Sequence, residues 1–203
     1  MSNIKTVVFD LGGVLIDWNP RHLYRKIFDS EQEMERFLSE VCTPEWNVQQ
    51  DGGKLFSTAT AELTAKFPEH AANIALYYDR WEEMLGGEIR ETVDLLYELK
   101  SSGMPLYALT NWSHEAFPVA FERYPFMKQF EGIVVSGFEG LLKPDHAIYR
   151  LLIDRYGINP AESVYIDDNF ANYQAAAELG FHSIHFLSPS QLAEELRSLG
   201  LAV

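Results

Sequence analysis

Residues 7–15 of the chain read Val-Val-Phe-Asp-Leu-Gly-Gly-Val-Leu, an apolar run interrupted by a carboxylate and a pair of glycines. The first part of this run is short and rich in β-branched and aromatic side chains, which is typical of a buried strand. Glycine tolerates sharp backbone turns, so Asp10 is expected at the carboxyl end of that strand, beside a turn. Taken alone, such an aspartate is more often a turn residue or a helix cap than a catalytic group.

Further apolar runs of the same character follow, and helical patterns separate the later ones. The predicted strands are Lys5–Phe9, Leu106–Leu109, Gly132–Val135, Val164–Ile166 and Ser183–Phe186. Predicted helices cover residues 89–99, 148–156 and 169–179, each ending near a glycine. Because strands that alternate with helices form parallel sheets covered on both faces, the chain is predicted to be α/β. Ligands of such sheets bind at the carboxyl ends of the strands.

Residues 18–87 have a different pattern, with helical amphipathicity and no clear strand. The sequence therefore predicts a helical insertion directly after the first strand. The predicted domains are a core, residues 1–17 and 88–203, and a small helical cap, residues 18–87. The turn at Asp17–Pro20 and the pair Gly86-Gly87 are the expected hinges.

The composition excludes several classes of protein. The 203 residues carry a formal charge of −14, and 47% of them are apolar, which excludes a disordered chain. The acidic balance argues against partners such as nucleic acid or anionic lipid, and no apolar run is long enough to cross a membrane. A single cysteine, Cys42, and no secretory signal fit a soluble cytoplasmic protein. The oligomeric state stays open.

Polar residues occupy the ends of three other predicted strands or the segments beside them. Thr110 and Asn111 could offer a hydroxyl and a backbone N–H to a phosphate oxygen, or simply begin a helix. Lys143 precedes a proline just ahead of a helix, where a solvated lysine is the ordinary interpretation. The pair Asp167-Asp168 offers the hard oxygen ligands that suit Mg²⁺, although loop acids are common.

Together and in this order, these four segments resemble the motifs of the haloacid dehalogenase-like hydrolase superfamily. The resemblance covers about residues 4–17 and 88–187. It implies a Rossmann-like sheet with a helical cap after the first strand, and a Mg²⁺-dependent phosphomonoester hydrolase acting on a small phosphorylated metabolite. Within the superfamily the chain resembles glucose-1-phosphatase-like sugar-phosphate phosphatases, which also carry Asp-Leu-Gly in the first motif.

The resemblance also assigns roles to individual residues. Asp10 would attack phosphorus and form an aspartyl-phosphate. Thr110 and Asn111 would bind phosphoryl oxygens, and Lys143 would neutralise the charge of the phosphate and the nucleophile. The implied Mg²⁺ ligands are Asp10, the backbone carbonyl of Gly12, and Asp168, with Asp167 alongside or behind it.

One position departs from the family pattern. Most phosphatases of the family place a second aspartate, the general acid and base, where this chain has Gly12. Asp17, a cap residue or a substrate hydroxyl could supply the proton instead. If none does, the rate should depend strongly on how well the leaving group carries negative charge.

Two rival functions stay open. A 2-haloacid dehalogenase would lack the acid at position 12 too, but would have no use for the metal that Asp167-Asp168 suggest. A catalytically weak relative that binds a phosphorylated metabolite or a partner protein is the other. Three tryptophans, Trp18, Trp46 and Trp112, could line a cleft between cap and core or pack in the interior.

Overall fold

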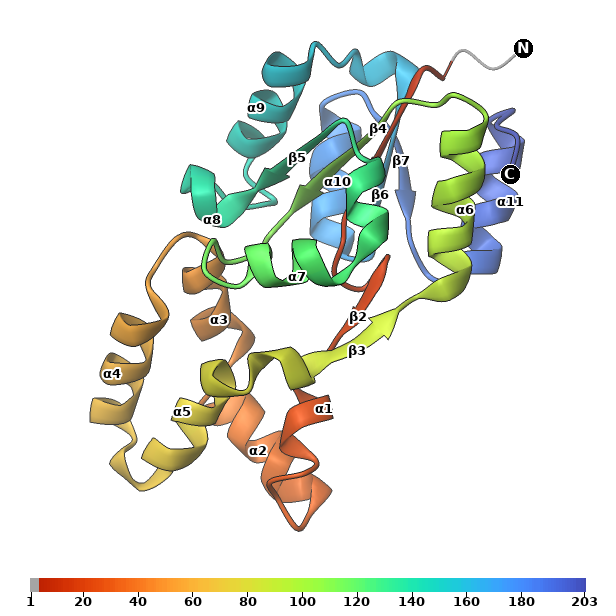
Figure 1. Cartoon of the computed structure of the whole chain (residues 1–203). Coiled ribbons are helices and arrows are strands. Elements are labelled where there is room, and N and C mark those ends of the chain that lie inside the picture. Colours follow the sequence, from red (N-terminus) through yellow and green to blue (C-terminus); the bar gives the residue numbers. More distant parts are fainter. Residues whose placement is uncertain (1–3) are drawn as a thin grey trace.

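The computed structural model describes residues 4–203, and its centre is a five-stranded parallel sheet in the order β5-β4-β1-β6-β7 (Figure 1). The strands are β1 (Thr6–Phe9), β4 (Leu106–Thr110), β5 (Gly132–Val135), β6 (Ser163–Asp167) and β7 (His182–His185). Every predicted strand is found, to within one residue at each end. The prediction of an α/β, Rossmann-like sheet is confirmed.

Helices cover both faces of the sheet because neighbouring residues of each strand point to opposite sides. Val7 and Phe9 belong to a large apolar cluster with residues of α6, α7 and α11. Val8 belongs to a second cluster with α9 and α10 on the other face. The bounds of these helices are α6 Arg90–Ser101, α7 Phe117–Arg123, α9 His146–Tyr156, α10 Phe170–Glu178 and α11 Pro189–Ser198. Shorter pieces are α8 (Ser136–Glu139), η3 (Pro125–Gln129) and η4 (Pro160–Glu162).

The register of the sheet brings the polar strand ends to one level. Phe9 pairs with Ala108 on one side and with Ile166 on the other. Asp10 therefore stands beside Asp167, and Thr110 lies two residues beyond the level at which β1 ends. Because the strands are parallel, all of these residues emerge at the same edge of the sheet.

The inserted segment is joined to the core by a two-stranded antiparallel ribbon, β2 (Ile16–Trp18) and β3 (Leu85–Glu88), in which Asp17 lies opposite Gly87. Both predicted hinges overlap this ribbon. The expectation that residues 18–87 contain no strand was wrong at their ends, because strands of three and four residues, one with a Gly-Gly pair, are too short to give an alternating apolar pattern.

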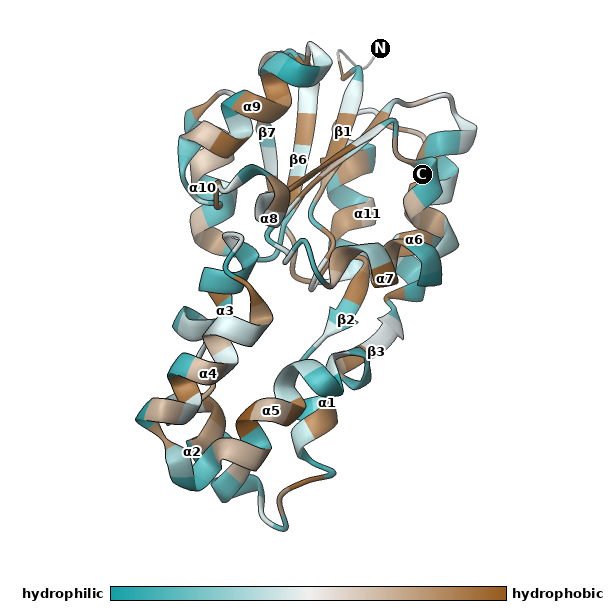
Figure 2. Cartoon of the chain, turned by 60° about the vertical axis from the view of Figure 1, so that its left-hand side comes forward, coloured by the Kyte–Doolittle hydropathy of each residue, from teal (hydrophilic) through white to brown (hydrophobic). Residues whose placement is uncertain are grey.

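Between β2 and β3 the chain is helical. The elements are α1 (Arg21–Tyr24), α2 (Glu31–Glu40), α3 (Pro44–Asp51), α4 (Phe56–Lys66), η1 (Pro68–His70), α5 (Ala71–Asp79) and η2 (Trp81–Met84). Figure 2 shows these helices gathered beneath the core, beyond β2 and β3. Tyr24, Phe37 and Tyr77 are buried among them and form a cluster of tilted rings with centroids 5.0 to 6.2 Å apart. The segment therefore has apolar packing of its own, and we call it the cap. Across residues 4–203, no helix combines the length and apolar character needed to cross a membrane.

Candidate active site

A buried lysine stands at the centre of the polar edge of the sheet. The ammonium of Lys143 lies 3.0 Å from Asp10 Oδ1, and donates hydrogen bonds to Asp167 Oδ2 at 2.7 Å and to the carbonyl oxygen of Leu109 at 2.9 Å. Its three donors thus meet the ends of β1, β6 and β4. Burial alone would lower the pKa of Lys143, but the carboxylates of Asp10 and Asp167 outweigh it and raise the pKa. The lysine is therefore a permanent positive charge in this site.

The side chain of Asn111 fixes the backbone of that lysine. Asn111 Nδ2 donates to the carbonyl of Lys143 at 3.0 Å, and the N–H of Lys143 donates to Asn111 Oδ1 at 2.9 Å. This reciprocal pair joins the loop after β4 to the loop before α9. Sequence reasoning missed this contact, since it considered only the backbone N–H of Asn111. Binding of phosphate by that N–H stays a prediction.

Asp167 is fully buried, and both of its oxygens accept hydrogen bonds. Besides Lys143, the donors are the Tyr165 hydroxyl at 2.7 Å, the Asn169 N–H at 2.9 Å and Asn172 Nδ2 at 3.1 Å. A carboxylate with four such partners is held in one orientation. This arrangement suits a residue that positions Lys143 better than one that binds a metal directly.

Asp10 is 7% exposed, and its Oδ1 also accepts the N–H of Leu11 at 2.7 Å. Burial raises the pKa of Asp10 to about 7; Lys143 opposes the rise, and Asp167 and Asp168 add to it. The crowding of negative charge at this point is thus only partly offset by the lysine. A cation bound here would relieve it.

The donor set fits a hard divalent cation. Carboxylate oxygens of Asp10, Asp167 and Asp168 all lie within 4.8 Å of one another. Asp168 is the exposed member, and its carboxylate packs against Gly13, where a Cβ atom would lie 2.3 Å from Asp168 Oδ2. Gly13 also has a φ of +75°, which favours glycine, and a side chain there would displace the Asp168 carboxylate. Oxygen ligands grouped in this way suit Mg²⁺.

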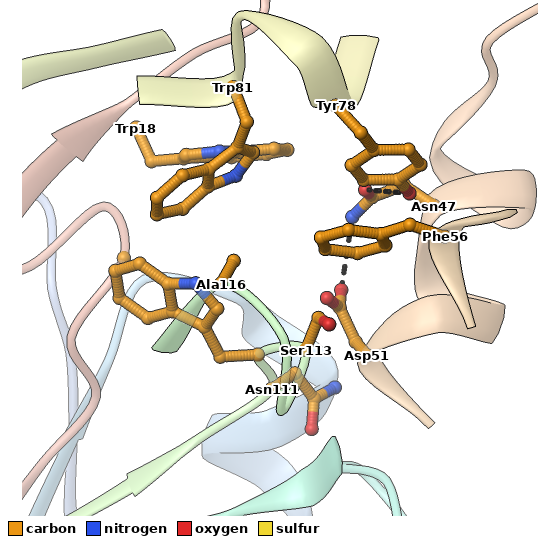
Figure 3. Close-up of a pocket in the computed structure, with 11 residues that line it drawn as sticks. Trp18, Asn47, Asp51, Phe56, Tyr78, Trp81, Asn111, Ser113 and Ala116 are labelled. Carbon is orange, nitrogen blue, oxygen red and sulfur yellow. Dashed lines mark hydrogen bonds between the residues drawn. The ribbon is translucent and has the colours of Figure 1, made fainter. Parts of the chain in front are cut away.

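A cavity of about 70 Å³ extends from this edge of the sheet toward the cap. The core contributes Gly12, Asn111, Trp112, Ser113 and Ala116, and the cap side contributes Trp18, Asn47, Asp51, Phe56, Tyr78 and Trp81. Figure 3 shows the aromatic rings as two walls. In one of them Phe56 stacks on Tyr78, with ring centroids 3.7 Å apart. Of the three tryptophans considered from the sequence, Trp18 and Trp112 line the cavity, whereas Trp46 packs on Tyr77 inside the cap.

Thr110 and Gly12 fall at the same edge, whereas Asp17 does not. Thr110 is 1% exposed at the end of β4. Gly12 opens onto the cavity, where a Cβ atom added to it would meet nothing within 4 Å beyond its own chain neighbours. Asp17 lies elsewhere, on β2 of the ribbon. Its carboxylate is hydrogen-bonded to Nε2 of His22 in α1 at 2.9 Å. Sequence reasoning also missed Asp51 of the cap, the last residue of α3, because Gln-Gln-Asp-Gly-Gly has the polar character of any solvated helix end.

Comparison with known proteins agrees with this geometry. The family model of haloacid dehalogenase-like hydrolases matches residues 4–180. A sesquiterpene phosphatase from Aspergillus oryzae is 27% identical over 98% of this chain and 97% of its own length. An (S)-2-haloacid dehalogenase from Pseudomonas fluorescens is 23% identical over 89% of this chain and 83% of its own.

A solved structure has the same fold. It is a mutant of a family enzyme from Bacteroides thetaiotaomicron in complex with magnesium and inorganic phosphate, with a TM-score of 0.68 and 22% identity over 91% of this chain and 95% of that one. The matched family model spans β1, β4, β5 and β6 of the sheet, the cap and all four motif segments. The chain belongs to the haloacid dehalogenase-like hydrolase family.

Proposed function

We propose that this hydrolase is a Mg²⁺-dependent phosphomonoester hydrolase that works through an aspartyl-phosphate on Asp10. The observation that carries the proposal is the Asp10 carboxylate, held 3.0 Å from the buried Lys143 and grouped with Asp167 and Asp168. A nucleophilic carboxylate is repelled by a phosphate dianion, and a fixed cation beside it reduces that repulsion. The complex of a family relative with magnesium and phosphate supports this interpretation.

The roles of the chain's own residues follow from their positions. Asp10 attacks phosphorus, Lys143 holds the attacking carboxylate and offsets the charge of the phosphoryl oxygens, and Thr110 donates its hydroxyl to one of these oxygens. The backbone N–H of Asn111 binds another of these oxygens. Asp10, the Gly12 carbonyl and Asp168 would hold Mg²⁺, while Asp167 would orient Lys143 from behind. When bound, Mg²⁺ would screen the charge between carboxylate and phosphate and orient the phosphoryl group.

For the substrate we propose a small phosphorylated metabolite whose organic part has an apolar face. The aromatic walls of the cavity, Trp18, Trp81, Trp112 and the stacked pair Phe56 and Tyr78, favour such a group. This substrate class includes the sugar phosphates expected from the first motif, since a sugar ring presents C–H faces. It also includes phosphorylated sesquiterpenes, the kind of compound in the name of the phosphatase from Aspergillus oryzae.

The test is phosphate release from para-nitrophenyl phosphate in Mg²⁺ and in excess chelator. We expect activity only with the metal. Asp10→Asn should abolish turnover while leaving the melting temperature nearly unchanged, because the substitution is isosteric and removes only the nucleophile. Undiminished release in chelator, or an active Asp10→Asn variant, would contradict the proposal. Chloride release from 2-chloropropionate without metal would identify a dehalogenase instead.

A further inference from the structure

The cavity holds an acid that none of the four motif segments contains. Asp51 ends α3 in the cap and lines the cavity beside Ser113 of the core (Figure 3). Among the lining residues within the described range 4–203, it is the only one with a carboxyl group. It therefore shares the cavity with Gly12, the position at which the chain lacks the usual acid.

Contacts on both sides hold Asp51 in place. Within the cap, Asn47 Nδ2 donates to Asp51 Oδ2 at 3.0 Å, and the Tyr78 hydroxyl donates to Oε1 of the adjacent Gln50 at 2.8 Å. From the core, the Ser136 hydroxyl donates to the carbonyl of Asp51 at 2.5 Å and accepts the N–H of Trp112 at 2.9 Å. The position of the carboxyl group is thus tied to the loop that follows β4, and not to the cap alone.

The surroundings of Asp51 also tune its acidity. Burial raises the pKa of Asp51 to about 7; a hydrogen bond from the backbone of Ser113 opposes the rise, and the charge of Asp10 adds to it. The other titratable groups that interact with it are the hydroxyls of Tyr77 and Tyr78 on α5. A group with a pKa close to the working pH is the most efficient general acid and base.

Asp17, the acid suggested by the sequence, is placed less well. Its carboxylate pairs with His22 and packs against Gly86 on the β2–β3 ribbon, and its side chain is 50% exposed. It does not line the cavity. Glu115, just before α7, does not line the cavity either, and its carboxylate accepts the N–H of Phe56 at 2.6 Å.

We propose that Asp51 is the catalytic acid and base of this enzyme, supplied by the cap in place of a side chain at position 12. The inference rests on the proposed function. As Asp10 bonds to phosphorus, the leaving oxygen keeps the electron pair of its P–O bond and takes the proton of the Asp51 carboxyl group. The Asp51 carboxylate then takes a proton from water as the water oxygen attacks the aspartyl-phosphate. The electron pair of the broken bond returns to Asp10, and orthophosphate leaves.

This role changes the expected dependence on the leaving group. With Asp51 as proton donor, the parent enzyme should hydrolyse phenyl phosphates of graded leaving-group pKa, and simple alkyl phosphates, at similar rates. In Asp51→Asn, kcat for alkyl phosphates should fall by about 10²–10⁴-fold. Formation of the phosphoenzyme from para-nitrophenyl phosphate should change little, because nitrophenolate leaves without a proton. The second step lacks its base, so a burst of nitrophenol is expected.

The experiment measures single-turnover and steady-state rates of the parent, of Asp51→Asn, and of Asp79→Asn as a matched control. Asp79 is also the last residue of a cap helix, α5, but is exposed, so its variant should behave as the parent does. The double variant Gly12→Asp/Asp51→Asn should recover alkyl phosphate hydrolysis, since position 12 has room for a side chain and no positive φ.

The outcomes separate the two proposals. Equal losses in the single-turnover rate of phosphoenzyme formation from aryl and alkyl substrates in Asp51→Asn, or no loss, would overturn the role of Asp51, as would an Asp17→Asn variant with the selective alkyl defect. Selective loss together with recovery in the double variant would support it, and recovery also shows that the variant folds. A parent protein that releases no phosphate from any of these substrates with Mg²⁺ would instead overturn the proposed function.

Discussion

The core and cap sides of the site differ in how much of their surface is polar. In the core, the ammonium of Lys143 has three partners and the carboxylate of Asp167 has four, all in fixed geometry. On the cap side, the cavity is walled by aromatic rings, and among residues 4–203 the buried Gln50 Nε2 beside it has no hydrogen-bond partner. The core side is therefore preorganised for one reaction, whereas the cap side leaves space in which substrates can differ.

The largest effect is expected when the ammonium group of Lys143, at the centre of the core network, is removed. Lys143→Met leaves Asp10 and Asp167 buried without their counter-ion, so unfolding free energy should fall by about 3–5 kcal/mol. Activity should fall by about 10²–10³-fold or more, as when a fixed electrostatic contact is lost. Urea unfolding and phosphate release measure the two effects.

The control is Lys100→Met, which removes a surface pair with Glu131 at 3.6 Å. Exposed pairs contribute about 0–1 kcal/mol, so this variant should be nearly as stable and active as the parent. Equal losses in both variants would show that the core network is not specially stabilised.

Substitutions at two adjacent glycines compare the packed core side with the open cavity within one loop. Gly13→Ala places a Cβ atom 2.3 Å from Asp168 Oδ2 at a φ of +75°, whereas Gly12→Ala meets only open space in the cavity. The first variant should lose about 1–3 kcal/mol of stability and need more Mg²⁺ for half-maximal rate. The second should keep its stability. Metal titration and thermal unfolding of the pair check this, and the prediction fails if the two variants respond alike.

A stability measurement tests the acid on the cap side. The folded pKa of Asp51, about 7, lies above the ordinary value for an aspartate, so its ionised form opposes folding. The penalty is absent at pH values below the unfolded pKa of about 4, grows as the pH rises, and is complete above the folded pKa of about 7. Asp51→Asn should therefore stabilise the metal-free protein by about 1–3 kcal/mol, and more at about pH 8 than at about pH 5.5. Calorimetry in chelator gives the difference; an equal gain at both pH values would contradict the assigned environment.

The smallest effect is expected at the aromatic wall. Phe56→Leu removes the stack on Tyr78, worth about 0.5–1.5 kcal/mol, so KM for phenyl phosphate should rise about two- to tenfold with little change in kcat. Phe170→Leu, on the exposed face of α10, is the control. A change confined to kcat would place Phe56 in the chemistry and not in substrate binding.

The same contrast explains how far the sequence alone reaches. The strands were predictable because a short apolar run that ends in a polar residue is typical of a buried strand. Parallel strands then bring those polar residues to one edge of the sheet. Asp10, Thr110 and Asp167 were located in this way, whereas Lys143 was singled out only through the resemblance to the family. The hydrogen bonds between Asn111 and Lys143 were not, since they join residues 32 positions apart through an amide that sequence reasoning had no reason to orient.

The cap was less predictable for a physical reason. Its helices follow from amphipathic spacing, but the side chains that face the core depend on how the cap docks. One hydroxyl, that of Ser136, joins the end of α3 to Trp112, and no local pattern around Asp51 contains that contact. Trp18 and Trp46 likewise look alike in the sequence, yet one lines the cavity and the other fills the cap interior.

The ribbon of β2 and β3 brings the beginning and the end of the inserted segment side by side. The chain leaves the core through Trp18 and returns through Leu85, which is its partner across the ribbon, and the N–H of Ile89 donates to the carbonyl of Leu15 at 2.9 Å. The two exits are thus neighbours, whatever the length of chain between them. A tight turn could close the gap as readily as the helices of the cap do. New substrate preferences can therefore arise by grafting or trimming at this junction, while the strand that carries the nucleophile keeps its register.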